Sequence, residues 1–203
     1  MKKSLLFLIC IALIGTSLLA SEQTDEANAS FTYKGKPIHP FLLHEFSNWL
    51  SDDRPPMITT VDVAAAFDTN KYQQSTIQLR DGCVFVERRE EDKGVPIYES
   101  FDYQRLGKMA NGIHVLETTE NGGGSGFFMN LIFVRFSEGE IMFENKNEKQ
   151  LLMSIVGTYR LGDRYEGKVE VFPNRVLIHA SPKQFGGGSI EEDVELKFPK
   201  RVK

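Results

Sequence analysis

The chain has 203 residues and a mass of 23.0 kDa; 41% of its residues are hydrophobic, 26% are charged, and its formal net charge is −4. This size allows one sizeable hydrophobic core and does not require a second domain. The composition is that of a folded chain, and the acidic balance argues against a nucleic-acid-binding protein, which needs clustered basic residues to meet phosphates. Two cysteines cannot build a disulfide-dense scaffold.

Residues 1–20 have the pattern of a secretory signal peptide. A short basic start precedes an apolar run from Leu5 to Ile14, and small Ala20 follows at the expected cleavage point. The alternative is a retained membrane anchor, but the apolar run is short for the roughly 20 residues that a spanning helix needs. Lipidation is not expected, because Cys10 lies inside the apolar run and not at the cleavage point. We therefore expect an exported protein, periplasmic or extracellular, with no membrane span after cleavage.

Cleavage after Ala20 would change the charge and the cysteine count. It would remove Lys2 and Lys3, which takes the formal net charge from −4 to −6, and it would also remove Cys10. Cys83 would then be the one cysteine left, so no internal disulfide is possible. Its apolar surroundings indicate a buried thiol that packs as a small hydrophobic side chain. The alternative is a reactive or intermolecular thiol, but no basic residue adjoins Cys83 in the sequence to activate it.

The mature chain is expected to begin with a flexible tether over residues 21–30, followed by a single β-rich domain over residues 31–203. The first expected element is one short helix over about residues 40–50, because Pro40 suits a first helical position. Its apolar residues fall on one helical face and would dock it on the core: Leu42, Leu43, Phe46, Trp49 and Leu50.

Further along the chain the apolar period is two residues, which is typical of strands with one face in water. Asp81-Gly82 lies between two such runs and predicts a tight hairpin. Pro173-Asn174 predicts another turn, and Ser137-Glu138-Gly139 a third. Alternating runs that predict strands include residues 76–80, 83–88, 168–171, 175–180 and 193–198.

The run from Phe127 to Phe136 is apolar on both faces, with only Asn130 and Arg135 interrupting it. A strand of this kind must be covered on both sides, so we expect it at the centre of a sheet, with the helix or a second sheet over one side. About nine or ten strands and one helix predict a mainly β fold: an antiparallel β-sandwich or barrel.

Two glycine clusters are the strongest candidates for a binding site. The first precedes a strand and lacks the Lys-Ser/Thr of a phosphate-binding loop, and Phe127 occupies the place of the second glycine of a nucleophile elbow. Both clusters can be plain flexible loops. As a ligand-binding rim they would include Gly122, Gly123, Gly124, Ser125, Phe127, Phe185, Gly187 and Ser189.

The favoured hypothesis is thus a binding or interaction module, whose partner is a protein or glycan of the cell envelope and which needs no cofactor. The alternative is an envelope hydrolase with Ser125 as nucleophile, His114 or His179 as base, and an acid such as Asp102. The sequence spacing does not bring these residues together. In the non-catalytic interpretation, both histidines are hydrogen-bonded or solvent-facing residues of strands.

Metal binding is not expected. His39, His44 and Glu45 lie close together in the sequence, but histidines five residues apart do not stack on one helical face as an i, i+4 zinc pair does.

Overall fold

The computed structural model describes residues 24–27, 29–46, 58–69, 76–92, 95–143, 146–181 and 190–198. The predicted signal peptide and the predicted contact of Trp49 with the core lie outside these residues.

Seven antiparallel strands form the main sheet, in the order β3-β9-β8-β7-β6-β5-β4. They are β3 (Thr60–Asp62), β4 (Gln78–Arg80), β5 (Cys83–Asp92), β6 (Val95–Lys108), β7 (His114–Asn121), β8 (Phe128–Phe143) and β9 (Lys146–Asp163). From β4 to β9 each strand pairs with the next one along the chain, which is the arrangement that short hairpin turns produce. The prediction of a mainly β, antiparallel fold is confirmed.

The predicted tight turn at Asp81-Gly82 joins β4 to β5. Both residues have positive φ, 51° for Asp81 and 82° for Gly82, as the favoured two-residue hairpin turn requires. Asp is one of the few non-glycine residues that enter this region at low cost, so the Asp-Gly pair explains the turn.

A second, three-stranded antiparallel sheet comprises β10 (Val169–Val171), β11 (Arg175–Ile178) and β12 (Val194–Lys197), in that order. The predicted turn at Pro173-Asn174 separates β10 from β11, and Val194 and Leu196 alternate with exposed residues as expected. Two short strands, β1 (Thr32–Tyr33) and β2 (Lys36–Pro37), pair with each other.

The helical part differs from the prediction of a single helix over about residues 40–50. Helix α2 (Pro40–His44) begins at the predicted proline but is only five residues long, and a turn at residues 45–46 follows. A second helix, α3 (Val63–Thr69), was not predicted, because its alanine-rich sequence has a weak apolar period. Residues 24–27 and 29–30 are also helical, and Ala27 is fully buried, which differs from the predicted flexible tether.

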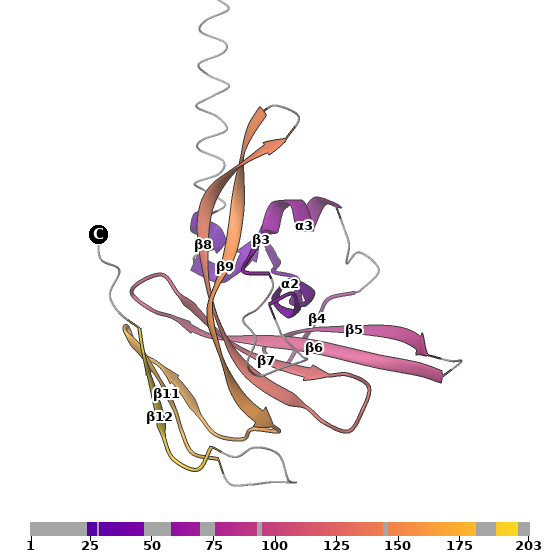
Figure 1. The fold of residues 1–203 in the computed structure, drawn as a ribbon, viewed down its shortest axis with the longest axis vertical. Helices are drawn as coiled ribbons and strands as arrows, with labels where there is room; N and C mark the ends of the chain where they lie inside the picture. Colours follow the sequence, from indigo (N-terminus) through magenta and orange to yellow (C-terminus); the bar gives the residue numbers. More distant parts are fainter. Residues whose placement is uncertain are drawn as a thin grey trace, which may run out of the picture.

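Strand β8 separates two hydrophobic cores, as its apolar sequence on both faces predicts. Ile132, Val134 and Phe136 point to one face of the sheet, and Leu131 and Phe133 point to the other. In Figure 1, α2 and α3 lie on one side of β8 and β9, and β10–β12 lie on the other. We call these the inner face, which carries the helices, and the outer face, which carries the second sheet.

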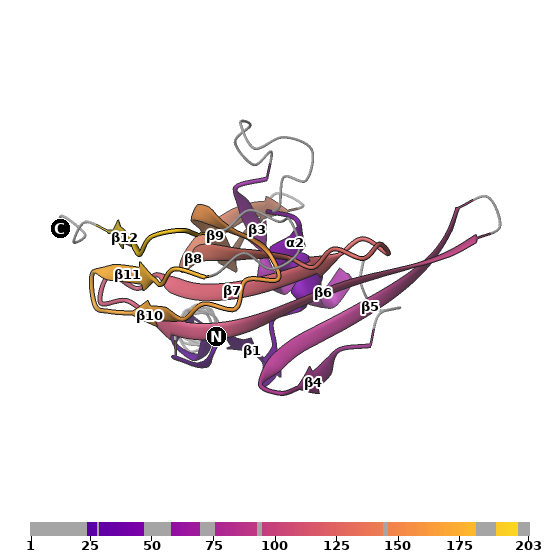
Figure 2. The same ribbon diagram turned by 90° about the horizontal axis from the view of Figure 1, so that it is seen from below.

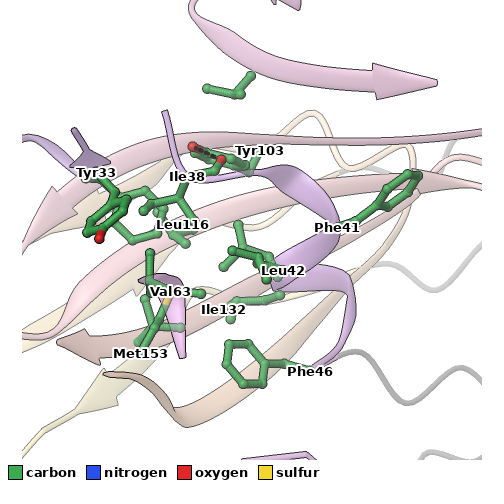
Figure 3. Packing of buried hydrophobic residues seen from close by; sticks show 14 of the residues in the cluster. Tyr33, Ile38, Phe41, Leu42, Phe46, Val63, Tyr103, Leu116, Ile132 and Met153 are labelled. Atoms are coloured by element: carbon green, nitrogen blue, oxygen red, sulfur yellow. Dashed lines mark hydrogen bonds between the residues drawn. The ribbon is translucent and has the colours of Figure 1, made fainter. Parts of the chain in front are cut away.

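Residues that precede the main sheet in the sequence supply a large share of the core of the inner face (Figure 3). Side chains from β6, β7, β8 and β9 meet side chains of the chain between Phe31 and Phe46, and Val63 of α3 joins them. Within it the hydroxyl of Tyr103 donates a hydrogen bond of 2.8 Å to the buried carbonyl of Ile38. Leu42 and Leu43 of α2 and Phe46 in the turn after it, which the sequence assigned to the core, are all buried.

The core of the outer face joins the two sheets. Val176 and Ile178 of β11 are fully buried against a cluster that includes Leu131 and Phe133 of β8. The two sheets come close together at Gly107, where β6 bulges: a Cβ there would lie 3.1 Å from the Cβ of Val171. The missing side chain of Gly107 therefore lets β10 approach β6.

The predicted turn at Ser137-Glu138-Gly139 is wrong, because β8 continues through it to Phe143 in unbroken register with β9. Gly139 is a packing residue instead: a Cβ at this position would overlap the side chain of Leu152. The long β8–β9 hairpin and the β5–β6 hairpin both extend away from β10–β12, the latter clearly in Figure 2. No helix in the described ranges is both long and apolar enough to cross a membrane.

Candidate functional site

The first glycine-rich loop joins β7 to β8 and is ordered by one side chain. The amide of Asn121 donates to the carbonyls of Gly124 and Gly126, at 3.1 and 2.8 Å, and its oxygen accepts from the N–H of Gly123 at 2.8 Å. Gly123 has φ of 87°, so it needs to be glycine. Asn121 is buried while residues 122–125 are exposed, so the loop projects into solvent from a fixed base.

The far side of this loop is fixed by the end of β9. Asp163 accepts a 2.8 Å hydrogen bond from the N–H of Phe127, and the N–H of Arg164 donates to the Phe127 carbonyl at 2.9 Å. The Arg164 guanidinium bonds to the Ser125 carbonyl and to Asp163, and its carbon lies 5.5 Å from the centre of the Phe127 ring. The ring itself remains 44% exposed. Phe127 is thus an exposed aromatic side chain on a backbone held from both sides.

The second glycine-rich loop leaves the end of β11, and only its base is described. The N–H of Ser181 donates to the carbonyl of Ile190 at 2.9 Å, which closes the base. The predicted rim residues Phe185, Gly187 and Ser189 lie outside the described residues.

The segment after β9 contacts both loop regions. Arg164 bonds to Ser125 in the first loop, and two residues later the N–H of Glu166 donates to the Ser181 hydroxyl at 3.3 Å. Residues 164–166 span only about 7 Å even when fully extended. The base of the second loop therefore lies at the same end of the molecule as the first loop. We call this the loop end.

The predicted catalytic residues are not joined. Neither His114 nor His179 hydrogen-bonds to Ser125 within the described part of the chain, and the Ser125 backbone carbonyl bonds to Arg164. His114 opens β7, whereas the loop follows the end of that strand, about 20 Å away at the usual rise per residue.

The carboxyl of Asp102, the predicted orienting acid, hydrogen-bonds Thr119, and partial burial raises its pKa. Across the sheet, Asp102 pairs with Thr119 on one neighbouring strand and with Phe85 on the other. Along β6 it lies between Phe101 and Tyr103, whose side chains point to the inner face. Asp102 therefore points to the outer face, whereas His114 belongs to the inner one.

His179 has a different setting. Its two ring nitrogens lie 3.1 Å from Asp193 and 3.2 Å from Glu170, and it is partly exposed. Both hydrogen bonds to carboxylates can form at once only when the imidazole carries both protons. The residue therefore links β10, β11 and the start of β12 as a structural contact. His179 is hydrogen-bonded as interpreted from the sequence, but it lies one residue past the end of β11 and not in the strand. His114 is neither solvent-facing nor hydrogen-bonded within the described residues.

His39 and His44 do not form a common site. The His39 ring accepts a 3.2 Å hydrogen bond from the Phe41 N–H and so caps α2, while His44 lies 2.6 Å from the carboxylate of Glu120. No group of three or more metal-ligating side chains occurs among the residues that the structure describes.

The Cys83 thiol is half-buried and free. Burial, together with the negative charges of Asp102, Glu117 and Asp81, raises its pKa above the ordinary value, which keeps it in the less reactive thiol form.

Sequence reasoning missed Arg164 as the residue that fixes the loop and Glu120 as the partner of His44. Their partners lie 39 and 76 residues away, and no local pattern signals pairs of that separation. No family model, no curated protein and no solved structure matches the chain.

Proposed function

We propose that the protein is an exported binding module whose ligand is a component of the cell envelope, a glycan or a protein, and that it binds this ligand at the loop end. Export rests on the signal-peptide pattern of residues 1–20. The single observation that carries the site is Phe127, a 44% exposed phenylalanine held in place by Asp163 and Arg164.

Two physical arguments support the loop end. Aromatic and arginine side chains supply a large share of binding energy at interfaces, and here they lie next to each other. A backbone that is already ordered loses little conformational entropy when a ligand binds. Asn121 and Arg164 supply that order in a loop that would otherwise be flexible.

Among the described residues the inner face gives no comparable site, because N-terminal residues of the chain itself fill it. Phe31, Ile38, Leu42 and Phe46 are all buried there. A ligand would have to displace them, whereas Phe127 needs no rearrangement to make contact.

A co-sedimentation assay with purified bacterial peptidoglycan sacculi, and in parallel with envelope membrane vesicles, tests the proposal. Phe127→Ala should reduce the bound fraction at least fivefold in whichever preparation retains the wild-type protein. Leu79→Ala is the matched control, because Leu79 is another large exposed apolar residue, 72% exposed, on β4 at the edge of the main sheet. An equal decrease of the bound fraction in both variants, or no decrease with Phe127→Ala, would contradict the assignment of the binding site to the loop end.

A further inference from the structure

His114 is an isolated polar group in the core of the inner face. It is fully buried at the start of β7, and neither ring nitrogen has a hydrogen-bond partner within the described residues. Its ring centre lies 5.3 Å from that of Phe31 and 5.4 Å from that of Phe136. Phe31 belongs to the chain that covers the inner face, whereas Phe136 belongs to β8. The imidazole is therefore packed between an aromatic ring of the main sheet and one of the chain that covers it.

The groups around His114 favour its neutral form. Arg105 and Lys108 on β6 are the charged residues that act on it, and both lower its pKa in addition to the larger effect of burial. From β8 it faces the apolar Val134 and Phe136. The Tyr103 ring contacts Phe31, as His114 does, and the Tyr103 hydroxyl is bonded to the Ile38 carbonyl. No neighbour described here supplies a carboxylate to an imidazolium.

The chain over the inner face packs against the main sheet through a broad apolar contact. We call residues 29–46 the N-terminal segment. Its strands β1 and β2 pair with each other and not with the main sheet. The backbone hydrogen bonds described for Ile38 and Leu42 run to Phe31 and His39, within the segment itself. Among the polar contacts described between this segment and the sheet are the Tyr103–Ile38 bond, the His44–Glu120 pair and the Arg88 guanidinium over the Phe41 ring.

We propose that His114 is an acid-sensitive lock, whose protonation releases the N-terminal segment from the inner face and exposes the apolar surface beneath it. A charged imidazole without a hydrogen-bond partner is costly in an apolar core, and removal of Phe31 gives it access to water. The outer face has its own contacts: Val176 and Ile178 pack there without His114, so β10–β12 stay in place. Each pH unit below the ordinary imidazole value can raise the opening equilibrium by up to tenfold.

Hydrogen-exchange mass spectrometry of the purified protein between pH 7 and pH 4, corrected for the intrinsic exchange rate, tests this directly. Peptides from residues 29–46 should lose protection by pH 4, while peptides from β10–β12 keep theirs. Fluorescence of the apolar dye ANS should rise over the same range. Equal loss of protection in both regions, or none in either, would overturn the proposal.

Two substitutions assign the effect to His114. His114→Leu and His114→Gln both remove the titration and differ in size and polarity, so either one that folds should keep residues 29–46 protected at pH 4. His44→Gln is the matched control and should keep the acid response, because His44 is partly exposed and paired with Glu120.

An acid response in a folded His114 variant that equals the wild-type response would refute the lock. So would a native-state imidazole signal of His114 that titrates above pH 5 by NMR, a measurement that needs no variant.

Discussion

The buried hydroxyl of Tyr103 is the clearest polar contact between the main sheet and the N-terminal segment. It is 2% exposed, burial raises its pKa, and its hydroxyl lies 2.8 Å from the Ile38 carbonyl. Tyr103→Phe should lower the free energy of unfolding by about 1–2 kcal/mol, because the carbonyl then loses its buried partner. Urea denaturation measures this. Tyr98→Phe, at a 49% exposed tyrosine, is the control and should change the free energy by less than about 0.5 kcal/mol.

His114 makes the stability of the protein depend on pH. Burial and the charges of Arg105 and Lys108 lower its pKa from 6.5 to about 3. The unfolded chain therefore takes up a proton first as the pH falls. The free energy of unfolding should drop by up to about 1.4 kcal/mol per pH unit between pH 6.5 and pH 3, with no His114 contribution above that range.

Chemical denaturation at half-unit pH intervals measures this slope for the wild type and for His114→Leu. The variant should have a shallower slope between pH 6 and pH 4. Parallel curves for the two proteins would show that other groups cause the acid sensitivity.

At the scale of single elements, the close approach of β6 and β10 depends on Gly107. A Cβ at this position would lie 3.1 Å from the Val171 Cβ and 3.2 Å from its Cγ1. Gly107→Ala should destabilise the protein by about 1–3 kcal/mol, because added volume in a packed contact forces backbone shifts. Thermal denaturation of the wild type and of Gly107→Ala measures this loss of stability.

Gly157 provides the control for this substitution. It lies in β9, where an added Cβ would meet no heavy atom within 4 Å. Gly157→Ala should therefore leave the melting temperature unchanged or raise it slightly, since alanine restricts the unfolded chain. If both variants lose the same stability, close packing at Gly107 is not the cause.

The sequence predicts those turns and strands that are determined by residues close together in the chain. Asp81-Gly82 and Pro173-Asn174 turn the chain where expected, and the apolar residues on both faces of β8 do separate two cores. The turn expected at Ser137-Glu138-Gly139 failed, because the need for glycine there comes from Leu152 on the neighbouring strand. A glycine required by a distant side chain has the same sequence signal as a glycine required by a turn.

Only the part of the candidate site that lies in the first glycine-rich loop could be predicted from the sequence. The glycine cluster and Phe127 are visible in the sequence, but Arg164, which bonds to the loop and lies against the Phe127 ring, comes from the far end of β9. The sequence also did not predict the unpartnered imidazole of His114, since a histidine in an apolar run gives no sign of whether a hydrogen-bond partner will face it.

At the scale of the whole molecule, one curled sheet is covered on its two faces by different parts of the chain. The N-terminal segment and helices cover the inner face, and β10–β12 cover the outer face (Figures 1 and 2). Both faces are therefore used for packing. The exposed aromatic of the β7–β8 loop remains available at the loop end, next to the base of the second glycine-rich loop.

Site-specific photo-crosslinking in exporting bacterial cells is the most direct test of binding at the loop end. A photoreactive phenylalanine analogue replaces Phe127 in one variant and Leu79 in the matched control, since both positions are exposed. We predict a discrete adduct with an envelope component after irradiation of the position-127 variant and none from position 79. The same adducts from both positions, or no adduct from position 127, would contradict the account.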